Sequence, residues 1–114
     1  MSGWSISVSD YEKLKAEPYG ARDDKRCSYV ASWETDWDGL DWIETLLADG
    51  RATLISRNIY PNHYRITVRE LAQFLPGVLS DEPYRWKTVR KFNSEILAAL
   101  PPETELDVIA YDLS

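Results

Sequence analysis

Few side chains in this 114-residue chain have the types and spacings that catalysis or metal binding requires. His63 is the single histidine and Cys27 the single cysteine, whereas zinc and iron sites need several such ligands to converge. The segment 36–41 carries three aspartates that suit Mg²⁺ or Ca²⁺, but it lacks the ligand spacing and the terminal bidentate glutamate of an EF-hand. The sequence also has no nucleophile elbow and no glycine-rich phosphate loop. We therefore predict no enzymatic activity, no metal and no cofactor.

One alternative assigns chemistry to His63, which follows a Pro-Asn pair typical of a turn. A histidine in such a place can act as a general base. In this alternative, the chain is a small ligand-binding or enzymatic domain that uses His63, Tyr60, Tyr64 and nearby arginines. A deep, apolar-lined cavity holding His63 would favour it.

The most distinctive feature lies between Cys27 and Gly50, where six carboxylates and three tryptophans occur without a lysine or arginine. Tryptophan supplies a large, stiff contact area, and a field of one sign steers an oppositely charged partner. This acidic block therefore predicts a binding surface for a basic protein. The residues predicted to bind the partner are Trp37, Asp38, Asp41, Trp42, Glu44 and Asp49.

A helix over 39–48 is expected to position most of this surface, with Asp38 as its N-cap and Gly50 as its stop. Its apolar stripe of Leu40, Ile43 and Leu47, with Leu46 on the flank, faces the core. Trp42 lies about 160° from Leu40 on the helical wheel, so it is expected to point outward. For the other two tryptophans, the core is expected to take Trp33, and Trp37 suits the core or the interface equally.

The rest of the chain alternates between helical and strand patterns. The expected helices are 9–16 and 67–74, each opened by a capping box, and 83–99, the longest; the expected strands are 27–33, 52–57, 64–66 and 105–112, the middle two forming a hairpin. These elements predict one α+β domain over residues 1–114. Its mixed or antiparallel sheet has about four strands and is covered by three to four helices.

Composition limits the partners. A formal net charge of −6 and a pI near 4.7 disfavour direct binding of nucleic acid or of an anionic membrane. No signal peptide or membrane-spanning stretch is expected, and one cysteine suits the cytoplasm. The cations form two clusters, which indicate either a bipolar molecule or ordinary solvated surface: Arg51, Arg57, Arg65 and Arg69, and then Arg85, Lys87, Arg90 and Lys91.

The middle of the chain resembles a known group of proteins. The segment Gly39–Ile55, the turn Tyr60-Pro-Asn-His-Tyr and the run Thr67-Val-Arg-Glu-Leu-Ala-Gln-Phe-Leu are similar to small bacterial immunity proteins of polymorphic or contact-dependent toxin systems. The resemblance spans about Asp38 to Leu75 and transfers no individual residue. It implies a small, acidic, cytoplasmic, non-enzymatic protein that binds a basic nuclease or deaminase toxin domain and blocks its active site. A phage-type inhibitor or nucleic-acid mimic is the alternative among binding proteins.

Overall fold

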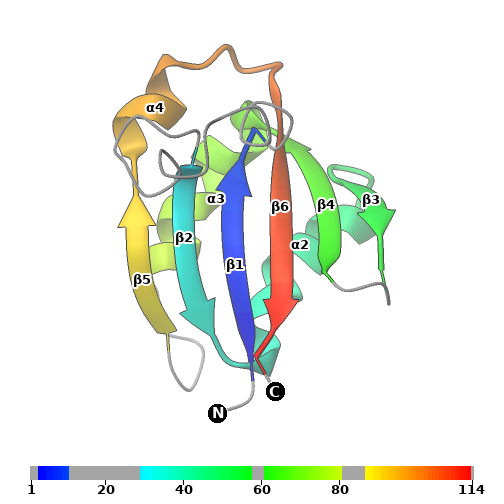
Figure 1. Cartoon of the computed structure of the whole chain (residues 1–114). Coiled ribbons are helices and arrows are strands. Elements are labelled where there is room, and N and C mark those ends of the chain that lie inside the picture. The colour runs from blue at the N-terminus through cyan, green and yellow to red at the C-terminus, as the bar shows by residue number, and fades with distance from the viewer. Residues whose placement is uncertain (1–2, 11–28, 58–60, 81–86, 114) are drawn as a thin grey trace.

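A single antiparallel sheet organises the computed structural model, which describes residues 3–10, 29–57, 61–80 and 87–113. The strands are β1 (Trp4–Ser9), β2 (Tyr29–Thr35), β3 (Thr53–Ser56), β4 (Asn62–Thr67), β5 (Lys87–Phe92) and β6 (Glu105–Asp112). Their order across the sheet is β3-β4-β6-β1-β2-β5, and every pairing is antiparallel (Figure 1). The strands nearest the two chain ends, β1 and β6, therefore lie side by side in the middle.

The helices pack on one face of this sheet. A 3-10 helix, η2 (Trp37–Leu40), leads directly into α2 (Asp41–Ala48), and α3 (Val68–Ser80) follows β4. In Figure 1, α2 and α3 lie behind the sheet, and the short α4 (Ser94–Ala99) caps the end of β5. None of the helices within the described ranges is long and apolar enough to cross a membrane.

Alternation along β1 shows how the sequence divides the two faces of the sheet. Ile6 and Val8 are fully buried and face the helices, whereas Ser7 between them faces the opposite side. The register places Ile6 opposite Trp33 of β2 and Ala110 of β6, and both of these residues are buried too. The core therefore lies between the central strands and the helices that cover them.

The predicted sheet of about four strands covered by three to four helices is wrong, because six strands pair within the described ranges and the three α-helices found there are short. One missed strand is β1. The other is β5, which occupies the middle of the predicted helix 83–99. Val89 and Phe92 are three residues apart, a spacing that also fits a helix, but pairing with β2 recruits this stretch into the sheet. The helix begins only at Ser94, where the Asn93 side chain accepts a hydrogen bond from the Ile96 amide.

Other predictions are confirmed in part. The closing strand has the predicted bounds, and β3 and β4 pair as the expected hairpin. Thr67 accepts the Glu70 amide as a cap, but α3 continues through Pro76 to Ser80 instead of ending near residue 74. The proline removes only one intrahelical donor there, and the helix retains its buried leucine face. The predicted helix 9–16 falls largely outside the described residues, and Ser9 itself ends β1.

Candidate protein-binding site

The turn after β2 fixes the start of the acidic block. Asp36 is buried and its side chain accepts a hydrogen bond from the Asp38 amide at 3.1 Å. Gly39 lies so close to Thr35 that an added Cβ would meet the threonine side chain at 2.0 Å. Asp36 is therefore the N-cap of η2, and the predicted capping role of Asp38 is wrong. With its amide held in this way, Asp38 keeps its side chain in solvent.

Trp37 is the outward-facing tryptophan of the block. It is 45% exposed, the largest fraction for any exposed large hydrophobic residue within the described ranges. Its ring meets Trp4 in a T-shaped contact with centroids 5.3 Å apart. Trp4 is half-buried and packs against the core, so it braces Trp37 from beneath. Trp37 is therefore an aromatic side chain at the surface that a second ring supports.

The expected outward orientation of Trp42 is wrong. Trp42 is half-buried, packs against the core, and stands 6.1 Å from Trp33 between ring centroids. The reason lies in the helix face, because α2 buries Ile43 and Leu46. Trp42 is only about 70° from the centre of that face, a position from which a large ring still reaches the core. Trp42 therefore serves packing in this structure.

Half of the carboxylates in the block are already engaged within the chain. Glu34 pairs with Arg90, and Glu44 pairs with Arg57 while accepting a hydrogen bond from the Tyr64 hydroxyl. Asp36 is the buried cap. The remaining three, Asp38, Asp41 and Asp49, are exposed and form no ion pair with any described cation.

Two of these three aspartates lie near Trp37 along the chain. Asp38 follows it directly and Asp41 begins α2, whereas Asp49 follows the opposite end of α2, about 12 Å further along the helix axis. We call Trp37, Asp38 and Asp41 the Trp37 patch. It combines one exposed aromatic side chain with two carboxylates that no described cation neutralises.

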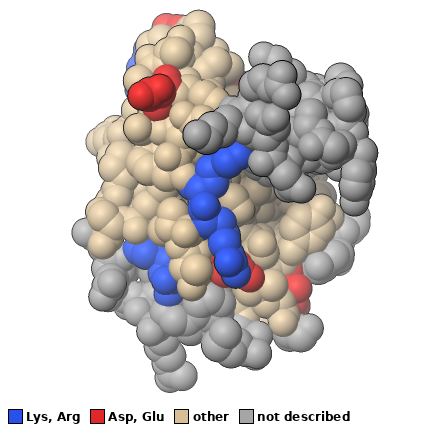
Figure 2. Space-filling model, turned by 60° about the vertical axis from the view of Figure 1, so that its left-hand side comes forward, with Lys and Arg blue, Asp and Glu red and all other residues tan. Residues whose placement is uncertain are grey.

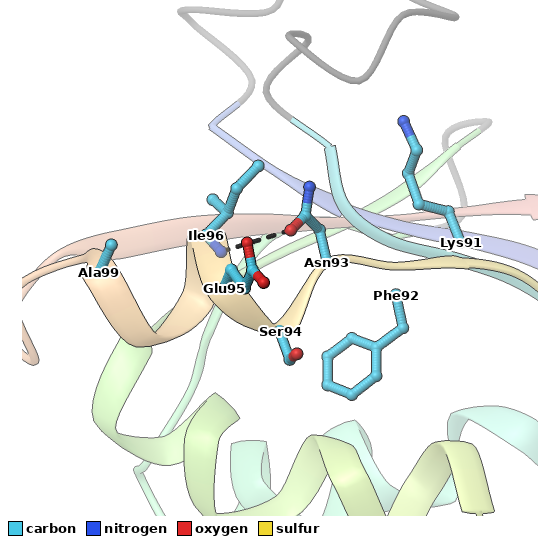
Figure 3. Close-up of a pocket in the computed structure, with 7 residues that line it drawn as sticks. All are labelled: Lys91, Phe92, Asn93, Ser94, Glu95, Ile96 and Ala99. Carbon is cyan, nitrogen blue, oxygen red and sulfur yellow. Dashed lines mark hydrogen bonds between the residues drawn. The ribbon is translucent and has the colours of Figure 1, made fainter.

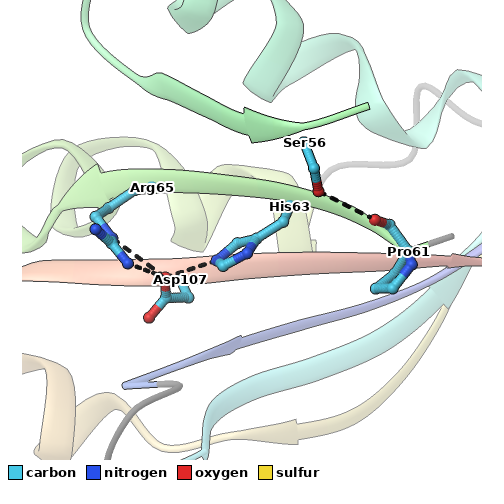
Figure 4. A network of polar contacts seen from close by, with 5 residues as sticks. All are labelled: Ser56, Pro61, His63, Arg65 and Asp107. Atoms are coloured by element: carbon cyan, nitrogen blue, oxygen red, sulfur yellow. Dashed lines mark hydrogen bonds and ion pairs between the residues drawn. The ribbon is translucent and has the colours of Figure 1, made fainter. Parts of the chain in front are cut away.

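The second candidate centre surrounds His63 on β4. Its Nε2 lies 2.7 Å from Oδ1 of Asp107, a buried carboxylate on β6 (Figure 4). Arg65 donates to the same oxygen from Nε and Nη2, at 3.2 and 3.1 Å. The β4–β6 register sets Arg65 directly opposite Asp107, so strand pairing assembles the cluster. Sequence reasoning named His63 and missed Asp107, whose signal is a lone acid within the apolar run of β6.

A pocket of about 820 Å³ opens where β5 meets α4, and His63 is not among the residues that line it (Figure 3). Its lining residues are Lys91, Phe92, Asn93, Ser94, Glu95, Ile96 and Ala99. Within the His63 cluster, the Arg65 guanidinium compensates the charge of the buried Asp107 carboxylate. Over the described ranges, acidic, histidine and cysteine side chains form no group of three that could hold a metal ion.

Tyr64 is expected to make the stability of the protein depend on pH in the alkaline range. Burial and the hydrogen bond to Glu44 raise the pKa of Tyr64 from 10.0 to about 12. The unfolded chain ionises this phenol near pH 10 while the folded protein keeps its proton, so stability must fall as the pH rises from 10 to 12. The contribution, roughly 2–3 kcal/mol, is fully present below pH 10.

Urea unfolding at several pH values between 9 and 12 measures this effect. The Tyr64→Phe variant, which has no phenol proton at this position, is expected to lose less stability over the same range than the wild type. Parallel curves for the two proteins would show that Tyr64 titrates normally.

The arrangements at Trp37 and at His63 are described from this protein without a relative for comparison. Comparison with protein-family models, with curated proteins and with solved structures finds no match.

Proposed function

We propose that this protein is a binding module for a basic protein and that the Trp37 patch is the centre of its interface. The observation that carries the proposal is the exposure of Trp37 above Trp4, next to carboxylates that the described part of the chain leaves unpaired. Exposed tryptophans are enriched among the residues that dominate binding energy. A braced ring also loses little conformational entropy when a partner covers it.

The carboxylates have a separate role in this proposal. Asp38 and Asp41 add a local negative field to a chain whose formal net charge is −6. Such a field raises the rate at which a cationic surface arrives and orients it before contact. Asp49 contributes at longer range. Glu44 and Trp42, which sequence reasoning included in the interface, are engaged by Arg57 and by the core and contribute indirectly.

The partner we propose is a toxin domain of the nuclease or deaminase type, inhibited by occlusion of its active site in the cytoplasm. Two features support this choice. The middle of the chain resembles bacterial immunity proteins, and enzymes that act on nucleic acid carry cations that bind phosphate. An acidic surface with an aromatic anchor competes for those cations. This function requires no catalytic group.

The experiment is capture followed by kinetics. Immobilised protein is exposed to a lysate of cells that produce it, at low and at high salt, and retained proteins are identified by mass spectrometry. We expect the column to retain a protein with a basic domain at low salt. Expression of that domain alone should arrest growth. Co-expression of the present chain should restore growth. Capture of no basic protein at either salt concentration would refute it.

Neutralising the patch is expected to slow association with that domain. The Asp38→Asn/Asp41→Asn variant should associate about tenfold more slowly at low salt, and the difference should shrink at high salt. The matched control is Glu95→Gln/Glu105→Gln, which changes the net charge equally at exposed positions outside the patch. Stopped-flow or surface-based kinetics measure both. An equal decrease in the two variants would mean that overall charge, not the patch, governs association.

A further inference from the structure

The sheet ends at β5, and this edge carries an unusual set of side chains. Among the described strands, β5 has a neighbour on one side only, β2. An edge strand presents backbone N–H and C=O groups that can pair with another extended segment. With six residues, β5 is longer than the four-residue strand β3 at the opposite end of the sheet. It offers the larger template for pairing.

The two faces of β5 differ in chemistry. Val89 is 42% exposed and Phe92 is 37% exposed, and the register aligns them with Trp33 and Ala31 on the helix-bearing face. Arg90 turns to the other face, where it pairs with Glu34, and Lys91 is in register with Ser32 on that same face. One face of the edge therefore carries the adjacent cations Arg90 and Lys91, which share it because the β2–β5 pairing has a bulge between Ser32 and Trp33. The helix-bearing face carries Val89 and Phe92 together with Lys87, whose Nζ donates to the Val78 carbonyl of α3.

The cations of this region are visible as a surface feature. Figure 2 turns the β5 side of the molecule forward and shows Lys and Arg side chains in a stripe across it. Arg90 is 64% exposed, and its guanidinium pairs with a single glutamate from the neighbouring strand. An additional acidic side chain could therefore share this guanidinium, which has five donors.

We propose that the β5 edge binds an extended acidic segment of a partner protein, in which apolar and acidic residues alternate. Its backbone would extend the sheet by one strand. Because side chains alternate between faces, its apolar residues would contact Val89 and Phe92 while its acids face Arg90 and Lys91. Cations on an edge oppose pairing with most strands, and an acidic strand is the exception. A second copy of β5 is excluded as the occupant, since it would bring like charges together.

This inference is independent of the Trp37 patch, which has the opposite charge and a different anchor. The two surfaces make distinguishable predictions. Trp37→Ala should leave binding at the β5 edge unchanged, and substitutions at β5 should leave the association of a basic partner unchanged.

The probe is an eight-residue peptide of alternating valine and glutamate with blocked ends. Amide hydrogen exchange of residues 87–92 and calorimetric titration report its binding to the full chain. We expect slower exchange within β5 and weaker binding at high salt. The control peptides alternate valine with lysine, or place four valines before four glutamates. Protection of no β5 amide, or equal binding of the valine–lysine peptide, would show that the cations only block this edge.

Charge reversal at Arg90 gives the matched mutational test. Arg90→Glu should weaken binding of the valine–glutamate peptide about tenfold, because an opposite-charge pair across strands becomes a like-charge pair. Arg69→Glu is the control, since Arg69 is 65% exposed and also pairs with one glutamate. Arg90→Gln, which removes the charge without adding repulsion from Glu34, should give a smaller loss and guards against misfolding of the reversed variant. Equal affinities for the Arg90 and Arg69 variants would overturn the proposal.

Discussion

Replacing Trp33 with alanine is expected to lower the free energy of unfolding by about 3–5 kcal/mol, the largest effect of any single substitution proposed for this protein. Trp33 is 1% exposed and lies on β2, where it contacts Trp42 of α2 and pairs in register with Ile6 of β1. Truncation removes a large buried side chain and leaves a cavity that the surrounding sheet cannot close. Equilibrium urea unfolding at neutral pH measures the loss.

The Trp37→Ala variant is the natural comparison for this experiment. Trp37 makes one aromatic contact, with Trp4, and is 45% exposed. Its replacement with alanine should therefore lower the free energy of unfolding by about 1 kcal/mol or less. The two tryptophans are four residues apart in the sequence and differ almost entirely in burial. Similar losses from the two substitutions would contradict the assignment of Trp33 to the core and Trp37 to the surface.

Trp37→Ala is expected instead to weaken binding of the basic partner by about 2 kcal/mol or more, a decrease of roughly thirtyfold in affinity. The loss should appear mainly as faster dissociation, since the steering charges Asp38 and Asp41 remain in place. Ile55→Ala is the matched control. Ile55 is 44% exposed and lies on β3 at the edge of the sheet opposite β5.

Local patterns in the sequence predicted those parts of the fold that depend on local chemistry. The alternation of β6 fixed its bounds, and the spacing of Leu40 and Ile43 identified a buried stripe on the helix of the acidic block. In contrast, β5 was predicted as helix because the three-residue spacing of Val89 and Phe92 fits a helical period. In the strand these two side chains share a face only through a bulge in the pairing with β2. Only that pairing, with a strand more than fifty residues earlier, makes this stretch a strand.

For the candidate site too, local patterns predicted part of the structure and long-range contacts decided the rest. Counting charges located the acidic block, but it could not show which acids remain available. Glu44 is neutralised by Arg57, 13 residues away, and Glu34 by Arg90, 56 residues away. The pairing of β2 with β5 sets the Glu34–Arg90 contact, and a contact between α2 and the residue after β3 sets the Glu44–Arg57 pair. Neither contact is visible in a local sequence pattern. The six carboxylates of the block thus reduce to three exposed ones, two of them in the Trp37 patch.

Trp42, which was expected to point outward, packs against the core for a geometric reason, and Trp37, which suited core and interface equally, lies at the surface. The helical wheel placed Trp42 outward on the assumption of a regular helix from residue 39. The structure instead begins with a 3-10 turn over Trp37–Leu40 and starts α2 at Asp41. Leu46 is then buried, the apolar face shifts toward Trp42, and Trp37 is left at the surface.

The most direct test of the Trp37 patch is side-by-side capture on three columns that carry the wild type, Trp37→Ala and Ile55→Ala. Quantitative mass spectrometry compares the proteins that the three columns retain from one lysate. The affinity of each variant for the main basic protein is then measured. The proposal predicts that wild type and Ile55→Ala retain the same basic protein with equal affinity, and that Trp37→Ala binds it roughly thirtyfold more weakly. Equal retention by all three columns, or retention of no basic protein by the wild type, would contradict it.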